Sequence, residues 1–224
     1  MPAALIIGAS RGIGRELALQ YLVDGWCVLA TARTPEACRA LSALGAEAHQ
    51  LDVTSAESIA ALGWKLDDER LDVAFLVAGV YGPRVDGNVG PSEAEFDEVM
   101  HTNVLAAMRL LPLVAPLVAS TRGKLAVLSS RMGSIGARTS NAGSLYRASK
   151  AALNSVLVDT RLSPASQGAI CVAFHPGWVQ TDMGGAGASL TVQQSASGLR
   201  ATLAGLDNSA NGSFLDVDGT PIAW

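Results

Sequence analysis

The sequence lacks the cysteine pattern of a secreted or zinc-binding protein. Its three cysteines, Cys27, Cys38 and Cys171, are an odd number at unrelated spacings, and no CxxC pair occurs. Neither a disulfide framework nor a metal site is therefore predicted. We expect the three side chains to be small buried apolar groups in a reducing cytosol.

A strong charge of either sign is also missing. The 224 residues contain 16 Lys+Arg and 20 Asp+Glu, which gives a formal net charge of −4. Without a basic excess, neither nucleic acid nor an anionic membrane surface is predicted as a partner. The hydrophobic share of 49% is too high for a disordered chain and suits one folded domain, residues 1–224.

Targeting and membrane-spanning segments are not expected. The stretch Met1–Ile7 has no basic region, and its apolar part is too short for a signal peptide. The longest later apolar run, Leu110–Ala119, contains two prolines and is well short of the roughly 20 residues that span a bilayer. We therefore predict a soluble, cytoplasmic protein.

Short apolar runs alternate with helical patterns along the whole chain. Thr34–Glu36 and the capping box Ser92–Glu95 mark two helix starts. Near-continuous apolar runs are typical of strands that are buried on both faces of a parallel sheet. Seven runs are predicted as strands: Ala3–Ile7, Cys27–Thr31, Glu47–Leu51, Val73–Val77, Leu125–Ser129, Ile170–Phe174 and Ser213–Asp216. This alternation predicts a doubly wound α/β fold.

A glycine-rich turn follows the first predicted strand. Residues Gly8–Gly14 read GASRGIG and lead into a helical stretch, Arg15–Asp24. Glycines allow a tight turn and let a diphosphate approach the backbone at a helix N-terminus. The spacing is G-x-x-x-G-x-G and not the commoner G-x-G-x-x-G. The turn indicates a dinucleotide site, and a purely structural turn is the alternative.

The acidic residue that usually selects NAD is absent. NAD sites place Asp or Glu at the end of the second strand, where it holds the ribose 2′-hydroxyl. Here the stretch Ala30–Thr34 contains no acid. Arg33, helped by Arg11 in the glycine turn, suits a 2′-phosphate instead, and the alternative is that both are solvated surface arginines. The sequence thus predicts NADP(H) in preference to NAD(H).

Tyr146 and Lys150 give the sharpest catalytic signal. They are four residues apart, so they share one face of a helix. A nearby ammonium lowers the pKa of a phenol from about 10 toward the range that suits proton transfer. Such a pair alone is common on protein surfaces, but here Ser130 ends a predicted strand upstream and its hydroxyl is available to a substrate carbonyl. The three residues together favour a catalytic site.

These motifs resemble the short-chain dehydrogenase/reductase family. They occur in the family's order: Gly8–Gly14, Asp52-Val53, Ala78-Gly79, Asn103, Ser130, Tyr146 with Lys150, and His175–Gly177. Tyr146–Asn154 and His175–Gly185 resemble more narrowly the C-factor-like, carbonyl-reductase-like branch. The resemblance implies a Rossmann-type doubly wound parallel sheet with helices on both faces. It also implies hydride transfer between NAD(P)H and a small carbonyl or alcohol substrate, and the residues around Arg33 favour NADPH.

The resemblance implies a role for each matching residue. Tyr146 would be the general acid, Lys150 would lower its pKa and hold the nicotinamide ribose, Ser130 would polarise the carbonyl, and Asn103 would position a water. The implied cofactor contacts are Gly8, Ser10, Arg11, Gly12, Ile13, Gly14, Arg33, Asp52, Val53, Ala78, Gly79, Tyr146, Lys150, Pro176, Gly177, Val179 and Thr181. Among these, Asp52 and Val53 would contact the adenine.

The sequence departs from the family pattern at several positions. Ile7 stands where many relatives have Thr, and Leu76-Val77 replaces two asparagines. Ser130 lies farther before Tyr146 than in many members, and the shorter spacing points to Gly133. A short insertion after the strand explains the difference and leaves Ser134 as an alternative to Ser130.

Other features bear on the substrate side. Gly184–Ser189 is predicted as a mobile loop and a candidate lid. Tyr81, Trp178 and Met183 are candidates for lining an apolar pocket, with core packing as the alternative. His175 is expected to be structural.

Two other functions compete with the reductase. A dinucleotide-sensing regulatory protein with little turnover would explain the missing asparagines but not the retained proton donor. A sugar-nucleotide epimerase or dehydratase would need a longer chain and a different glycine spacing. The helical stretches Ser92–Ser120 and Ser144–Leu162 would pack against a second copy, which favours a homodimer or homotetramer.

Overall fold

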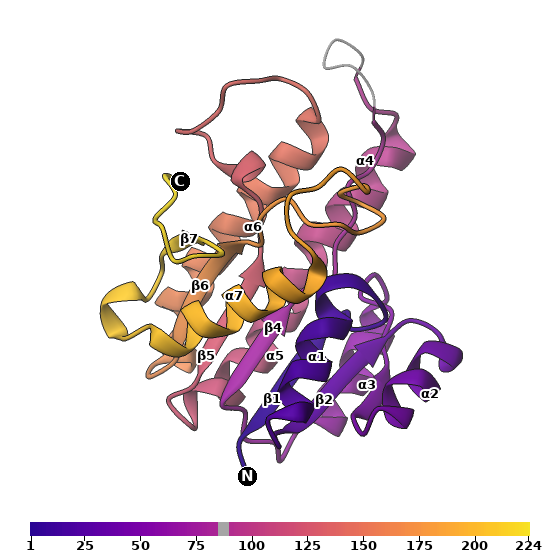
Figure 1. The fold of residues 1–224 in the computed structure, drawn as a ribbon, viewed down its shortest axis with the longest axis vertical. Helices are drawn as coiled ribbons and strands as arrows, with labels where there is room; N and C mark the ends of the chain where they lie inside the picture. Colours follow the sequence, from indigo (N-terminus) through magenta and orange to yellow (C-terminus); the bar gives the residue numbers. More distant parts are fainter. Residues whose placement is uncertain (85–89) are drawn as a thin grey trace.

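The computed structural model describes residues 1–84 and 90–224, which fold around a seven-stranded parallel sheet (Figure 1). The strands are β1 (Ala3–Ile7), β2 (Cys27–Ala32), β3 (Glu47–Gln50), β4 (Val73–Leu76), β5 (Lys124–Leu128), β6 (Ile170–His175) and β7 (Phe214–Asp216). Their order is β3-β2-β1-β4-β5-β6-β7, so the topological switch point lies between β1 and β4. The predicted doubly wound sheet is confirmed, and each predicted strand end is correct to within one residue.

Helices cover both faces of this sheet. On one face lie α1 (Gly12–Val23), α2 (Pro35–Ala43) and α7 (Val192–Gly205), and on the other lie α3 (Ala56–Lys65), α5 (Ala106–Ala119) and α6 (Ser144–Leu162). Successive residues of β1 alternate between the two cores: Ala4 and Ile6 pack with α1, while Leu5 and Ile7 pack with α5. Burial on both faces is why the central strands are apolar, whereas the edge strand β3 reads EAHQ and is partly exposed. Cys171 on β6 is buried as expected of the cysteines, but Cys27 at the start of β2 is exposed.

Residues Glu93–Ala119 form one continuous helical stretch. Its first part, α4 (Glu93–Met100), begins with the predicted capping box of Ser92 and Glu95. A π-helical segment, His101–Leu105, joins α4 to α5 and carries Asn103. Contrary to the sequence-based expectation, the stretch is long and apolar enough to cross a membrane by length and composition alone. Half of its most apolar window is nevertheless buried inside the protein, as in a helix that packs on a sheet.

The predicted site residues follow the carboxyl ends of the strands. Because all seven strands are parallel, these ends lie along one edge of the sheet, where doubly wound folds bind ligands. The segments that meet there are the glycine turn after β1, Arg33 after β2, Asp52 after β3, Ala78-Gly79 after β4, Ser130 after β5 and Pro176-Gly177 after β6.

Candidate functional site

The glycine turn after β1 approaches neighbouring backbone too closely for side chains. A Cβ on Gly8, whose φ is +93°, would lie 2.7 Å from the Ala78 nitrogen, and one on Gly14 would lie 2.1 Å from the Gly8 carbonyl oxygen. Glycine is therefore required at both positions. The hydroxyl that is lost at Ile7 has a substitute on β2, because Thr31 Oγ1 accepts a hydrogen bond from the Gly8 amide at 3.1 Å.

The first turn of α1 has no side-chain cap. Arg11 occupies the N-cap position with an extended backbone, and its side chain makes no bond to the first amides of the helix. Those amides lack partners within the helix, and the helix dipole adds partial positive charge at this end. Ser10 is exposed in the turn, while Ile13 is partly buried against the core. A close backbone turn with an uncapped helix start fits the diphosphate of a dinucleotide.

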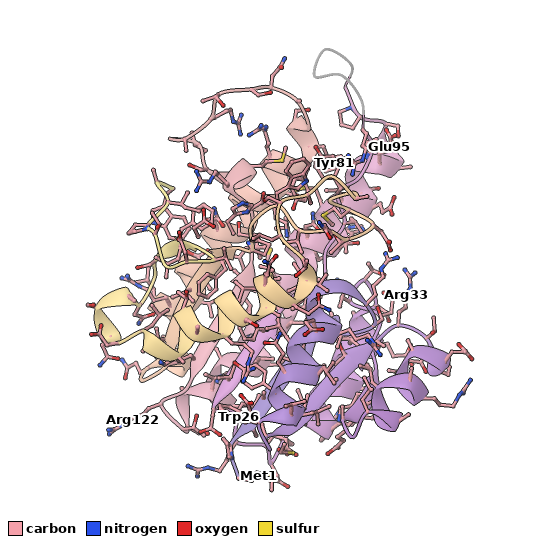
Figure 2. All side chains as sticks on the ribbon, viewed as in Figure 1. Met1, Trp26, Arg33, Tyr81, Glu95 and Arg122 are labelled. Carbon is pink, nitrogen blue, oxygen red and sulfur yellow. The ribbon has the colours of Figure 1, made fainter. Side chains whose placement is uncertain are left out.

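Arg33 and Asp52 are neighbours at the ends of β2 and β3. Hydrogen bonds from the Thr54 side chain and amide hold the pKa of Asp52 below its ordinary value, and the Arg33 charge acts in the same direction. The Asp52 Oδ1 atom accepts both bonds from Thr54, at 2.9 and 2.7 Å. Figure 2 shows Arg33 and Tyr81 toward the end of the sheet away from Met1. Exposed Arg33 can therefore meet a phosphate at the ligand-binding edge.

Three candidate catalytic side chains lie close together: Tyr146 and Lys150 on α6, and Ser130 after β5. The Lys150 ammonium lies 5.7 Å from the centroid of the Tyr146 ring and donates to the Leu128 carbonyl oxygen at 2.8 Å. Ser130 caps a short 3₁₀ turn, Arg131–Gly133, and its hydroxyl lies close enough to the Tyr146 phenol to act on the phenol pKa. All three side chains are buried, so the phenol is held in a fixed place.

Burial dominates the pKa values of this pair. It raises the pKa of Tyr146 to about 12, with the Ser130 hydrogen bond acting in the opposite direction, and it lowers the pKa of Lys150 to about 8. The lowering of the phenol pKa that was expected from Lys150 is not the net result in this structure, because desolvation favours the neutral form of both groups. Tyr146 keeps its proton at neutral pH, which suits a general acid.

Lys150 should make the free energy of unfolding depend on pH. The unfolded chain binds a proton up to the ordinary lysine pKa of 10.5, whereas the folded protein releases it near about 8. Stability should therefore rise with pH between these two values, and the full penalty of burying the charge applies below them. Lys150→Met should flatten that rise. Urea denaturation at several pH values across the window tests this, and equal slopes in the two proteins would contradict it.

Asn103 links the π-helical segment to the loop after β4. Its Oδ1 accepts from the Val80 amide at 2.8 Å, and its Nδ2 donates to the Val80 carbonyl at 2.8 Å and to Ser149 Oγ at 2.9 Å. A Cβ on Gly79 would lie 3.1 Å from Asn103 Oδ1 and 3.3 Å from Lys150 Nζ. Gly79, Asn103 and Lys150 therefore form one cluster, and the water that Asn103 would position stays a prediction.

An aromatic ring and a thioether lie against the phenol. The Tyr81 ring stacks on Tyr146 with centroids 4.6 Å apart, and the Met183 sulfur lies 4.0 Å from the phenol oxygen. The Arg84 guanidinium covers the Tyr81 ring at 4.9 Å. Trp178 is 57% exposed, and its indole N–H donates to the Gly184 carbonyl at 2.9 Å. Tyr81 and Met183 thus lie where an apolar substrate would contact the phenol. Trp178 instead stabilises the loop to which it belongs.

The two other serines near β5 have different partners. Ser134 donates to the carbonyl oxygens of Ala223 and Trp224 and accepts from the Ala137 amide. Ser129 donates to Asn154 Oδ1 on α6. Neither hydroxyl is directed to Tyr146 within the residues that the structure describes, so the geometry favours Ser130 as the serine that meets a substrate.

His175 is the last residue of β6. Burial lowers its pKa, while the charge of neighbouring Asp216 acts in the opposite direction. Asp216 is itself ion-paired with Arg131, so the histidine lies among groups that join β6, β7 and the 3₁₀ turn. This setting fits the structural role expected for His175.

The loop after β6 packs against the glycine turn. Ser195 of α7 donates to the Pro176 carbonyl at 2.7 Å, and Val179 forms a bridge with Leu190. The Thr181 methyl group would lie 3.3 Å from a Cβ on Gly12. One loop beside the glycine turn therefore contains four of the predicted cofactor contacts: Pro176, Gly177, Val179 and Thr181.

Sequence reasoning missed three residues at this site. Thr31 supports Gly8, Arg84 covers Tyr81, and Asp182 forms an ion pair with Arg11 at 2.6 Å. Asp182 directly follows Thr181, a predicted cofactor contact, so its place near the site could have been inferred from the sequence. Its partner Arg11 lies 171 positions earlier and could be recognised only from the folded structure.

Comparison with known proteins agrees with this geometry. The short chain dehydrogenase family profile matches residues 2–189. A 1-hydroxy-2-glutathionyl-2-methyl-3-butene dehydrogenase from Rhodococcus sp. (strain AD45) is 31% identical over 233 residues, which cover 100% of both chains. C-signal from Myxococcus xanthus is 36% identical over 132 residues, covering 58% of this chain and 80% of that protein.

A solved structure gives the same result. The carbonyl reductase from Pseudomonas aeruginosa PAO1 in complex with NADP superimposes with a TM-score of 0.85 at 34% identity, and 100% of each chain is covered. Both parts of the narrower resemblance, to C-factor-like and to carbonyl-reductase-like proteins, are thereby confirmed. The chain belongs to the short-chain dehydrogenase/reductase family of oxidoreductases.

Proposed function

We propose that this chain is an NADPH-dependent carbonyl reductase in which Tyr146 is the general acid. The observation that carries the proposal is the buried Tyr146 phenol with Ser130 and Lys150 around it. This cluster shares one edge of the sheet with a turn that fits a dinucleotide diphosphate. The carbonyl reductase in complex with NADP that resembles this chain supports the same pairing of cofactor and substrate class.

The cofactor is expected to lie along the carboxyl edge of the sheet. Gly8, Ser10, Gly12, Ile13 and Gly14 would hold the diphosphate at the start of α1. Arg33 and Arg11 would bind the 2′-phosphate, and no acid between Ala30 and Thr34 opposes it. The other expected contacts are Asp52 and Val53 at the adenine, Ala78 and Gly79 at the ribose, and Pro176, Gly177, Val179 and Thr181 at the nicotinamide. When bound, the cofactor supplies the hydride.

The protein's own residues orient the carbonyl and move the proton. Ser130 would hydrogen-bond the carbonyl oxygen and hold it beside Tyr146, which donates its proton as negative charge develops there. The Lys150 ammonium would stabilise the resulting phenolate and hold the nicotinamide ribose hydroxyls. Tyr81 and Met183 would exclude water from the reacting groups.

Arg33→Ala should weaken NADPH binding by roughly ten- to a hundredfold. The substitution removes a charge-assisted contact to the 2′-phosphate, which only NADPH has. Such a contact is typically worth about 1.5–3 kcal/mol. NADH affinity should change little. Fluorescence titration of both cofactors with both proteins measures the effect. Equal affinities of the unaltered protein for the two cofactors would contradict the 2′-phosphate assignment.

A panel of aldehydes and ketones, assayed with NADPH and with NADH by loss of absorbance, tests the activity. We expect turnover with NADPH, and slower turnover with NADH, for at least one class of apolar carbonyl. NADPH binding without turnover on any carbonyl would instead support the dinucleotide-sensing alternative. That alternative has less support, because the dehydrogenase relative matches the whole chain.

Assembly and location stay predictions. Met108 on α5 is 52% exposed and Leu162 on α6 is 64% exposed. We propose that a second copy of the chain covers these apolar side chains in a homodimer or homotetramer. A cytoplasmic location also remains a prediction from the sequence.

A further inference from the structure

Two arginines from distant parts of the chain hold adjacent residues of the loop after β6. Arg11, in the glycine turn, forms an ion pair with Asp182. Arg84, in the loop after β4, donates to the Met183 carbonyl oxygen. Between the two contacts, Asp182-Met183 runs from the glycine turn to the phenol of Tyr146.

The pairing of Arg11 with Asp182 conflicts with its proposed use. Arg11 is expected to help Arg33 bind the 2′-phosphate of NADP(H), yet its Nη1 atom is 2.6 Å from an Asp182 carboxylate oxygen. A carboxylate at this distance from the guanidinium repels a phosphate dianion that approaches the same group. Asp182 and the 2′-phosphate therefore compete for Arg11. NAD(H) carries only an uncharged 2′-hydroxyl at this position and does not compete for the guanidinium.

Release of Asp182 would also reach the substrate side. Met183 is the next residue, and its sulfur lies 4.0 Å from the Tyr146 hydroxyl, where a substrate carbonyl has to bind. The loop is stiffened by its own bonds, including one from the Gly184 amide to Thr181 Oγ1 at 3.1 Å. Movement of Asp182 is therefore expected to move Met183 with it.

We propose that Asp182 is a cofactor-discriminating residue that holds Arg11 until the 2′-phosphate of NADP(H) displaces it, and that this exchange loosens Met183 from Tyr146. The proposal rests on the NADP(H) binding proposed above. It gives the protein a means to sense the 2′-phosphate at the glycine turn and to admit substrate at the phenol.

Asp182→Asn should tighten NADPH binding by about two- to fivefold and leave NADH binding unchanged. The expected change in affinity is small because the side chains of the ion pair are 79% and 76% exposed, and exposed pairs are worth at most about 1 kcal/mol. Because Asp182 is exposed, the substitution should not impair folding. In the Arg11→Ala background the same substitution should have no effect, since the competing partner is gone.

Asp24→Asn is a matched control. Asp24 pairs with Arg200 and directly follows the last residue of α1, so its loss removes the same charge at the opposite end of that helix. It should change neither cofactor affinity. Hydrogen exchange without cofactor gives a second readout: residues 178–190 should exchange faster in Asp182→Asn than in the unaltered protein, and Asp24→Asn should not differ there.

The outcomes separate this inference from the proposed function. A tightening confined to NADPH and abolished by Arg11→Ala supports the competition. Unchanged or weaker NADPH binding in Asp182→Asn overturns it, and so does an equal gain for NADH. If the unaltered protein itself shows no preference for NADPH, the 2′-phosphate assignment of the proposed function fails, and this inference fails with it.

Discussion

Replacing Tyr146 with phenylalanine is expected to lower the rate of carbonyl reduction by about two to four orders of magnitude, the usual contribution of a general acid. The substitution removes the transferable proton and keeps the ring. Stacking on Tyr81, with centroids 4.6 Å apart, should therefore persist. NADPH affinity should change little, because the phenol hydroxyl is one of many proposed cofactor contacts. Steady-state rates and cofactor titrations on the same preparation measure the two effects separately.

Tyr81→Phe provides the matched control for this experiment. It removes a hydroxyl from the ring stacked on Tyr146 but leaves the proposed proton donor in place. We expect a change in turnover far smaller than that of Tyr146→Phe. A Tyr146→Phe variant that works at nearly the unaltered rate would contradict the assignment of the proton donor.

Ser130→Ala is expected to lower turnover by about two to three orders of magnitude. Loss of one preorganised donor to a developing oxyanion typically has this effect. Ser130 caps a 3₁₀ turn at the end of β5 and is buried, so its hydroxyl is fixed before charge develops on the carbonyl. NADPH binding should be retained. The rate of NADPH consumption at saturating carbonyl is the measurement.

Ser134→Ala is the control for the serine assignment. The Ser134 hydroxyl bonds the carbonyl oxygens of Ala223 and Trp224 rather than the phenol. Its loss should act mainly on the stability of this loop and only mildly on turnover. The reverse ranking of the two alanine variants would mean that the insertion lies between the strand end and the catalytic serine.

The fold could be predicted almost completely because its signals are local. A strand buried on both faces must be apolar along its whole length, so most of the seven strands stand out without any tertiary information, and only the edge strand β3 carries a weak signal. Helix starts such as Ser92 with Glu95 and Thr34 with Pro35 were also recognisable, because caps involve neighbours in sequence. Both caps are present in the structure.

Two features of the site depended on distant contacts and were not predictable. The direction of the Tyr146 pKa shift is set by burial, to which the stacked Tyr81 ring and the Met183 side chain contribute. The pairing of Arg11 with Asp182 follows from how that loop crosses the glycine turn. Sequence spacing indicated which residues meet on α6, but not how much water surrounds them.

The most direct test of the account follows a deuterium label. NADPH deuterated at its transferable hydrogen is supplied with a carbonyl that the protein reduces, and the alcohol is analysed by mass spectrometry. We predict one deuterium on the former carbonyl carbon of each product molecule, and none on that carbon when unlabelled NADPH is used in deuterated water. Product without the label from the cofactor would contradict the proposed hydride transfer.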